Sequence, residues 1–194
     1  MTTQETTEVT AQLNRAAGST MEVLRQVRAA QLALPTPCAS WDVRALINHF
    51  VGSARGWAAM LDGTAGADPA PDYAAGDYLA AYEESLRIAQ AAFTTEDALE
   101  RVVRMPQGEF PGMVLLGFAT TDQFVHGWDL ARAIGLPTAG LDPELAETLL
   151  AQARLAVTAD YRGPDGIAVF GPEQPAPAGA PASDRLAAFL GRSV

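Results

Sequence analysis

The sequence predicts an all-α protein, an up-and-down four-helix bundle with a short β-hairpin and a small C-terminal extension. Four long stretches carry apolar residues every three or four positions, and short connections rich in proline and glycine separate them. Of the 194 residues, 48% are hydrophobic, which is enough to fill one core. We therefore expect a single domain over residues 1–194, with the bundle at about 9–160 and the extension at about 161–194.

The first two helices are separated by prolines. The first is predicted from about Val9 to Gln31, and Pro35 and Pro37 stop it, because proline lacks a backbone donor and constrains the preceding residue. The second opens at Asp42, a good N-cap. Its inward stripe reads Leu46, His49, Phe50, Ser53, Trp57 and Met60. The stripe predicts that His49 lies on the buried face.

The middle of the chain alternates loops with regular elements. Residues Gly63 to Asp77 are rich in turn formers, so we expect a loop there, the best candidate for a lid. A third helix follows from Leu79 to Phe93. Between Leu99 and Phe110, β-prone residues precede the turn residues 106–108, which predicts a short hairpin.

The last third of the sequence begins with two well-marked helices. The fourth starts at Pro111 and ends at Gly135, and the fifth begins at Asp142-Pro143, a cap followed by proline. One strand is expected at Gly166 to Phe170, then an extended run over residues 172–182. A short last helix begins at Ser183 or Asp184 and ends at Gly191.

The candidate chemistry lies on the fourth helix. Asp122 and His126 are four residues apart, which places both on one helix face, about 6 Å apart along the axis. His49 is the other of only two histidines in the chain. We expect His49, Asp122 and His126 to meet as a three-ligand divalent metal site. Two imidazoles and one carboxylate suit zinc or nickel and leave coordination positions open for water or substrate.

Structural readings of the same residues stay open. His49 by itself is a core histidine that donates to a backbone carbonyl, and without any metal both histidines would sit in a polar core patch. Asp129, one turn beyond His126, is expected to orient an imidazole or to pair with Arg132 or a neighbouring helix rather than to bind the ion. Cys38, the single cysteine, is expected to be a buried or inert thiol.

Composition and motifs exclude several other functions. The net charge is −10, with 13 basic against 23 acidic residues and no basic cluster, so neither nucleic acid nor an anionic membrane is an expected partner. The start of the chain does not resemble a signal peptide and no apolar run approaches 18 residues, which predicts a cytoplasmic protein. Neither a Gly-x-Ser-x-Gly elbow nor a phosphate-binding glycine loop occurs. Monomer and homodimer both stay open.

Three stretches together resemble a known family. They are residues 36–49 (TPCASWDVRALINH), residues 122–133 (DQFVHGWDLARA) and the ending with Asp184-Arg185-Leu186 and Gly191-Arg192. They resemble the metal-binding domain of mycothiol-dependent maleylpyruvate isomerases, within the DinB-like superfamily, and most closely its short actinobacterial-type members.

The resemblance implies a four-helix bundle in which His49, Asp122 and His126 hold zinc or nickel. It also implies a low-molecular-weight thiol such as mycothiol, whose sulfur the metal would bind as thiolate. The isomerase carries glutamate where Asp122 stands, and it has a fused C-terminal domain for which this chain is expected to be too short.

Two functions follow as expectations. In the first, the protein is a thiol-dependent transferase or isomerase, in which the metal activates the thiol toward an electrophilic small molecule. In the second, it is a non-catalytic metal- or ligand-binding module with a structural or regulatory ion. An exchangeable water on the metal favours the enzyme, and a fourth protein ligand favours the module.

Overall fold

The computed structural model of the chain describes residues 3–64, 71–105, 108–164 and 167–194, and describes side chains in the first helix from residue 8 onward. Six α-helices and one two-stranded antiparallel sheet form the regular structure of those ranges. The predicted fold class, mostly helical with a short hairpin, is confirmed. None of the described helices is both long and apolar enough to cross a membrane.

The chain forms two compact units. The first unit comprises Met1–Met21 and Ile47–Phe124, and the second comprises Glu22–Leu46 and Val125–Val194. Helices α1 (Thr3–Leu24), α2 (Val43–Leu61) and α4 (Gly112–Ile134) each continue from one unit into the other. The expectation of a single domain stays a prediction.

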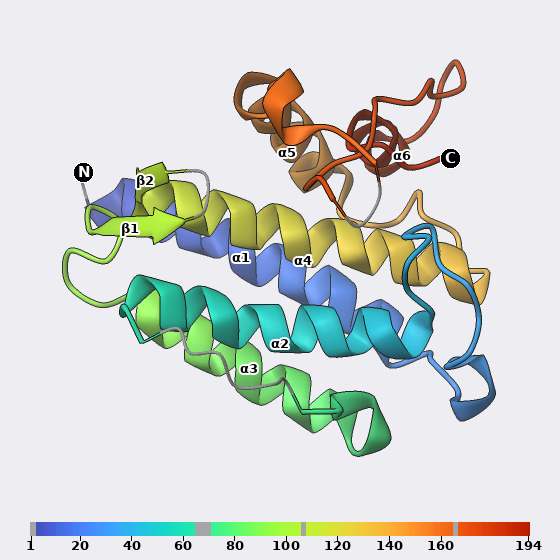
Figure 1. Ribbon diagram of the computed structural model, residues 1–194, viewed down its shortest axis with the longest axis horizontal. Helices are drawn as coiled ribbons and strands as arrows, with labels where there is room; N and C mark the ends of the chain where they lie inside the picture. The colour runs from blue at the N-terminus through green and yellow to red at the C-terminus, as the bar shows by residue number, and fades with distance from the viewer. Residues whose placement is uncertain (1–2, 65–70, 106–107, 165–166) are drawn as a thin grey trace. The chain divides into compact units, whose positions relative to one another are not determined.

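The first unit is a bundle of α1, α2, α3 (Tyr78–Phe93) and α4, with the hairpin of β1 (Val102–Met105) and β2 (Gly108–Pro111) at one end (Figure 1). All four helices and β1 contribute to one hydrophobic cluster. Its buried members are Leu13, Ala58, Leu61, Ala92, Phe93, Ala98, Leu99, Val103, Leu115, Leu116 and Ala119. This shared core fixes how the four helices face one another.

One feature of the bundle departs from strict alternation. Asn48 near the start of α2 bonds Asp72, just before α3, and Arg55 two turns later bonds Ser85 within α3, so α2 and α3 run in the same direction. The sequence suggested antiparallel neighbours. Parallel neighbours need a connection that returns along the helix, about 28 Å for the 19 residues of α2. Residues 62–77 are long enough, because an extended chain spans about 3.3 Å per residue.

The start of α2, the start of α3 and the end of α4 follow their sequence signals. Asp42 accepts the Ala45 backbone N–H at 2.8 Å, and Asp77 accepts that of Ala80 at 3.0 Å. The α4 helix ends before Gly135, whose φ of +77° suits glycine. The lid suggested within residues 63–77 falls partly on 65–70, outside the described residues, as does part of the hairpin turn, residues 106–107.

Two sequence predictions were wrong in detail. The first helix ends at Leu24 rather than near Gln31, because the chain turns after Val23 and resumes as a short 3-10 turn at Ala29–Gln31. The described part of the expected strand, residues 167–170, is not a strand. Phe170 forms only an isolated parallel bridge with Arg162.

The second unit contains the end of α4, then α5 (Pro143–Ala156) and α6 (Ala182–Phe189), which pack on each other. Asp184 on α6 accepts two hydrogen bonds on one oxygen, from Trp128 Nε1 at 2.8 Å and Thr138 Oγ1 at 2.6 Å. Trp128 is fully buried, as expected of a packing residue. The carboxylate of Asp184 therefore links α6 to α4.

Candidate metal centre

His49 and Asp122 meet in the first unit. The Nε2 atom of His49 lies 3.2 Å from Oδ1 of Asp122, and their side chains are 33% and 15% exposed. The second carboxylate oxygen, Oδ2, accepts hydrogen bonds from Ser53 Oγ at 2.7 Å and from Gln123 Nε2 at 3.1 Å. These two donors hold the carboxylate so that Oδ1 is the oxygen next to His49.

The position of His49 on α2 differs from the prediction. The fully buried face of α2 consists of Val43, Leu46, Ile47, Phe50, Val51, Ala54, Ala58 and Leu61. His49 and Ser53 lie at the edge of this face, and His49 is only partly buried. The stripe was shifted by part of a turn because small residues, Ala54 and Ala58, occupy core positions. At the edge, an imidazole contacts the core and also reaches solvent.

Gln123 connects all four helices of the bundle, a role that was not predicted from the sequence. Its amide nitrogen is a donor to the Phe50 carbonyl and Ser53 Oγ, each at 3.1 Å, and its Oε1 accepts the Tyr82 hydroxyl at 2.7 Å. Its backbone carbonyl accepts the Thr20 hydroxyl at 2.7 Å. A glutamine inside a helix looks ordinary in sequence, and its only signal was its place on the buried side of α4.

Tyr82 stays protonated in this setting. Burial raises the pKa of Tyr82 well above its usual range, and the negative charge of Asp122 raises it further. A neutral hydroxyl can donate to Gln123, which in turn donates to the Asp122 carboxylate. The polar interior of the first unit therefore orients Asp122 through two successive side chains.

His126 and its partners lie in the second unit. Its Nδ1 is 2.9 Å from Oδ2 of Asp129, which is completely buried. The same oxygen accepts Arg192 Nη2 at 3.0 Å and the Cys38 thiol at 3.2 Å, while Arg192 Nε donates to Oδ1 at 3.3 Å. The Trp41 ring packs beside the imidazole, with centroids 5.5 Å apart. Asp129 thus pairs with Arg192 and not with Arg132.

Asp129 is an ionised acceptor despite its burial. Burial alone would raise its pKa, but the Arg192 guanidinium and the hydrogen bond with His126 outweigh it and hold the pKa of Asp129 well below its usual range. Conversely, burial alone would lower the pKa of Arg192, and the Asp129 carboxylate raises it. Because an ionised carboxylate only accepts, the proton of a neutral His126 ring belongs on Nδ1, and Nε2 carries the lone pair.

Helix α4 carries both ligand candidates, Asp122 and His126, one turn apart on the same face. The donor set fits a divalent ion. Two ligands of one tetrahedral ion, each about 2.05 Å from it, lie roughly 3.3 Å apart. The separation of 3.2 Å between His49 Nε2 and Asp122 Oδ1 matches this spacing.

A second group of potential ligands does not fit an ion. Cys38, His126 and Asp129 bring one donor atom each within 4.8 Å of one another. Arg192 Nη2, however, contacts both the Cys38 sulfur at 3.6 Å and the Asp129 carboxylate. A cation there would meet a positive charge already in place, so this group supports His126 instead of holding a metal.

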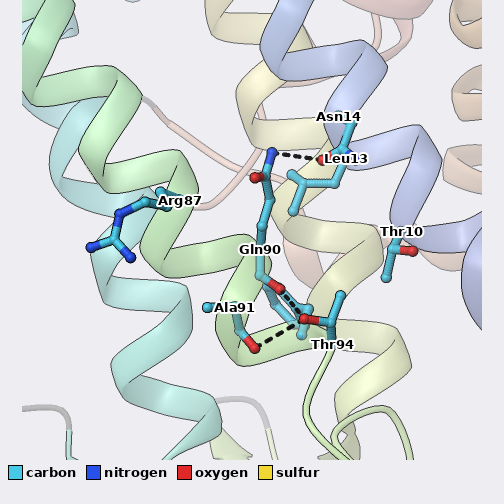
Figure 2. Close-up of a pocket in the computed structure, with 8 residues that line it drawn as sticks. Thr10, Leu13, Asn14, Arg87, Gln90, Ala91 and Thr94 are labelled. Carbon is cyan, nitrogen blue, oxygen red and sulfur yellow. Dashed lines mark hydrogen bonds between the residues drawn. The ribbon is translucent and has the colours of Figure 1, made fainter.

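A shallow pocket of about 320 Å³ lies between α1 and α3 (Figure 2). Its lining residues are Thr10, Leu13, Asn14, Arg87, Gln90, Ala91, Phe93 and Thr94. Gln90 donates to Asn14 across it at 2.8 Å, and Arg87 is paired with Glu84. Its lining includes no histidine or carboxylate, so its chemistry differs from that of the candidate ligands on α2 and α4.

The chain matches a known family model and two known proteins. Residues 13–131 match the family model of the mycothiol maleylpyruvate isomerase N-terminal domain. Two uncharacterized proteins of Mycobacterium tuberculosis, from strains CDC 1551 / Oshkosh and ATCC 25618 / H37Rv, are each 41% identical over 181 residues, covering 93% of this chain and 95% of the relative.

Solved structures share the fold. The mycothiol-dependent maleylpyruvate isomerase and one of its histidine-to-alanine mutants align with TM-scores of 0.59 and 0.60, at 21% identity over 78% of this chain and 71% of theirs. The family match covers more than half of the chain, and the mycobacterial relatives match nearly its whole length. The chain therefore belongs to the mycothiol maleylpyruvate isomerase N-terminal domain family.

Proposed function

We propose that the protein binds a divalent ion, zinc or nickel, through His49, Asp122 and His126, and uses it to activate a low-molecular-weight thiol such as mycothiol. The activity would be that of a thiol-dependent transferase or isomerase acting on an electrophilic small molecule. The observation that carries the proposal is the 3.2 Å approach of His49 Nε2 to Asp122 Oδ1, two donor atoms at the spacing of ligands on one ion.

The residues around the ligands support this role. Ser53 and Gln123 hold Oδ2 of Asp122, so that Oδ1 is the oxygen beside His49 that would bind the ion. Asp129 sets the tautomer of His126, as metal-binding histidines require. A bound divalent ion would lower the pKa of a coordinated thiol and so supply the thiolate nucleophile. The exposure of His49 at the edge of α2 favours an accessible ion over a sealed one.

Trp57 is a candidate contact for the body of the ligand. It lies two turns after His49 on α2, and its indole N–H is buried without a hydrogen-bond partner among the described residues. A buried donor of this kind costs free energy unless something accepts from it. An oxygen of the thiol or the electrophile would satisfy it, so Trp57→Phe should raise KM more than it lowers kcat.

Metal analysis tests the site. Zn²⁺-loaded wild type should retain about one ion per chain after desalting, whereas His49→Ala, Asp122→Ala and His126→Ala should each retain far less. Asp62→Ala is the matched control, because this carboxylate is exposed and pairs with Arg101. Equal metal content in all five proteins would refute the site.

A thiol-consumption assay tests the activity. Mycothiol and a panel of electrophiles, with maleylpyruvate among them, are incubated with metal-loaded wild type and His49→Ala. Faster loss of free thiol with wild type alone supports the enzyme. Tight metal binding without any turnover would favour the non-catalytic binding module.

A further inference from the structure

We propose that Arg192 is a positioning residue for the metal site: it anchors the Asp129 carboxylate, which in turn fixes the His126 ring with Nε2 as its unprotonated nitrogen. The predicted effect of Arg192 on metal affinity rests on the proposed function. The structural part of the inference, the control of His126 by Arg192, stands on contacts within the second unit.

The Arg192 side chain grips Asp129 at two points. Nε donates to Oδ1 at 3.3 Å and Nη2 donates to Oδ2 at 3.0 Å, the side-on geometry in which a planar guanidinium matches a carboxylate. The Asp129 side chain is fully buried and that of Arg192 is 12% exposed. A buried carboxylate keeps its charge and its orientation only where a cation or several donors hold it.

The contacts of the two Asp129 oxygens show why Arg192 in particular sets the orientation of this carboxylate. The thiol of Cys38 and Nδ1 of His126 both bond to Oδ2, and so leave the carboxylate able to rotate about its Cβ–Cγ bond. Arg192 holds both oxygens and prevents that rotation. The plane of the carboxylate then determines where the His126 ring points.

Backbone contacts of the segment after α6 position the Arg192 guanidinium. Gly191 has a φ of +96°, and a Cβ there would lie 2.6 Å from Cα of Gly171. Arg162 donates to the carbonyls of Gly171 and Phe189 at 2.9 and 2.8 Å. The Arg192 backbone N–H donates to Ala187 at 2.9 Å. Two chain segments are thus clamped together immediately before Arg192.

The test measures the His126 tautomer and metal affinity in Arg192→Ala, Arg192→Lys and the control Arg185→Ala. Arg185 is the other arginine near the end of the chain and pairs with Glu147 at the surface. Long-range ¹H–¹⁵N spectra of metal-free protein at one fixed pH report which ring nitrogen carries the proton. With only two histidines in the chain, His49→Ala assigns the signals.

Wild type and Arg185→Ala should show His126 with the proton on Nδ1. Arg192→Ala should show a mixture of tautomers and a Kd for Zn²⁺ raised about 10- to 100-fold, the usual cost of losing an outer partner of a metal-bound histidine. Arg192→Lys keeps the charge but not the pair of hydrogen bonds, so its tautomer mixture and its Zn²⁺ Kd should lie between those of wild type and Arg192→Ala. It can also be measured if the alanine variant does not fold.

The outcomes separate the two proposals. An unchanged tautomer and an unchanged Zn²⁺ Kd in both Arg192 variants would overturn the role of Arg192. If instead wild type and His49→Ala bind Zn²⁺ equally, the proposed function fails, while a tautomer change in the Arg192 variants still supports the control of His126. Circular dichroism of each variant confirms that only folded protein is compared.

Discussion

Among single residues, Gln123 and Tyr82 link α4 to the other helices of the first unit. The Tyr82 hydroxyl is buried and donates a hydrogen bond to Gln123 Oε1. The Gln123 amide in turn contacts the Phe50 carbonyl, Ser53 and Asp122. The orientation of Asp122, the proposed metal ligand, therefore depends on a hydroxyl of α3 to which it is not directly bonded.

Tyr82→Phe should lower the free energy of unfolding by about 1–3 kcal/mol, because it leaves a buried amide oxygen without its donor. Urea denaturation followed by circular dichroism measures the loss. Tyr73→Phe, at a half-buried position, is the control and should stay within about 0.5 kcal/mol of wild type. Equal effects at the two positions would show that the hydroxyl of Tyr82 contributes nothing.

Tyr82 also predicts an alkaline weakness. Its pKa is raised in the folded state, so its contribution is complete below the ordinary tyrosine pKa of about 10 and is lost as pH rises above it. Above that pKa, one such group lowers the free energy of unfolding by up to about 1.4 kcal/mol per pH unit. All 13 basic residues are arginine, so no lysine titrates in that range. Stability between about pH 10 and 11.5 should fall more steeply for wild type than for Tyr82→Phe; parallel curves would contradict the prediction.

At the scale of single residues, the sequence predicted the candidate metal ligands but not the residues that orient them. Asp122 and His126 were found because helical spacing is local information. Gln123 and Arg192 were not assigned roles, since their partners lie on other helices or about 60 residues away in sequence. Side-chain hydrogen bonds between distant segments leave no periodic pattern in a single sequence.

At the scale of elements, the start of α4 is held by the turn before the hairpin. The first backbone N–H groups of a helix lack partners within it, and here Gly112 donates to the Arg101 carbonyl at 2.8 Å and Met113 to the Leu99 carbonyl at 2.9 Å. The turn also leaves no room at Gly112, where a Cβ would lie 2.1 Å from the Ala98 carbonyl oxygen.

Two glycines of α4 should respond in opposite directions to alanine. Gly112→Ala forces the helix away from its backbone caps and should cost about 2–4 kcal/mol. At Gly117, a Cβ would meet nothing within 4 Å, so Gly117→Ala should be neutral or stabilise by up to about 1 kcal/mol through helix propensity. Thermal unfolding of the two variants compares them directly. A destabilised Gly117→Ala together with an unaffected Gly112→Ala would refute the argument.

Helix boundaries were predictable where a cap or a breaker marks them. The starts of α2 and α5 follow Asp42 and Asp142, and α4 ends just before Gly135, all within a residue or two of expectation. The end of α1 carries no such mark. There the polar sequence after Leu24 continues a plausible helical pattern, and packing of the following turn decides where the helix stops.

At the scale of the whole molecule, the junction of the two units falls inside a helix. The boundary between Phe124 and Val125 lies near the middle of α4. Breaking a helix in its interior removes several consecutive hydrogen bonds, so one half gains little by persisting when the other has melted. The direction of α3 could not be predicted from the sequence, because periodicity shows that a helix exists and not which way its neighbours run.

The protein should therefore unfold in one cooperative transition. Trp57 reports on the first unit, whereas Trp41 and Trp128 report on the second. In Trp57→Phe, tryptophan fluorescence follows the second unit, and in Trp41→Phe/Trp128→Phe it follows the first. Within each variant, the fluorescence midpoint in urea should coincide with that of circular dichroism at 222 nm. Two separated midpoints would show that the units are independent domains.

The unbroken course of α4 has a consequence for how the chain can vary. One residue added or removed between Asp122 and His126 would turn everything after it by about 100° about the helix axis. His126 would then leave the helix face on which Asp122 lies. The proposed ligand pair can therefore tolerate other side chains around it, but not a change in the number of residues that separate Asp122 from His126.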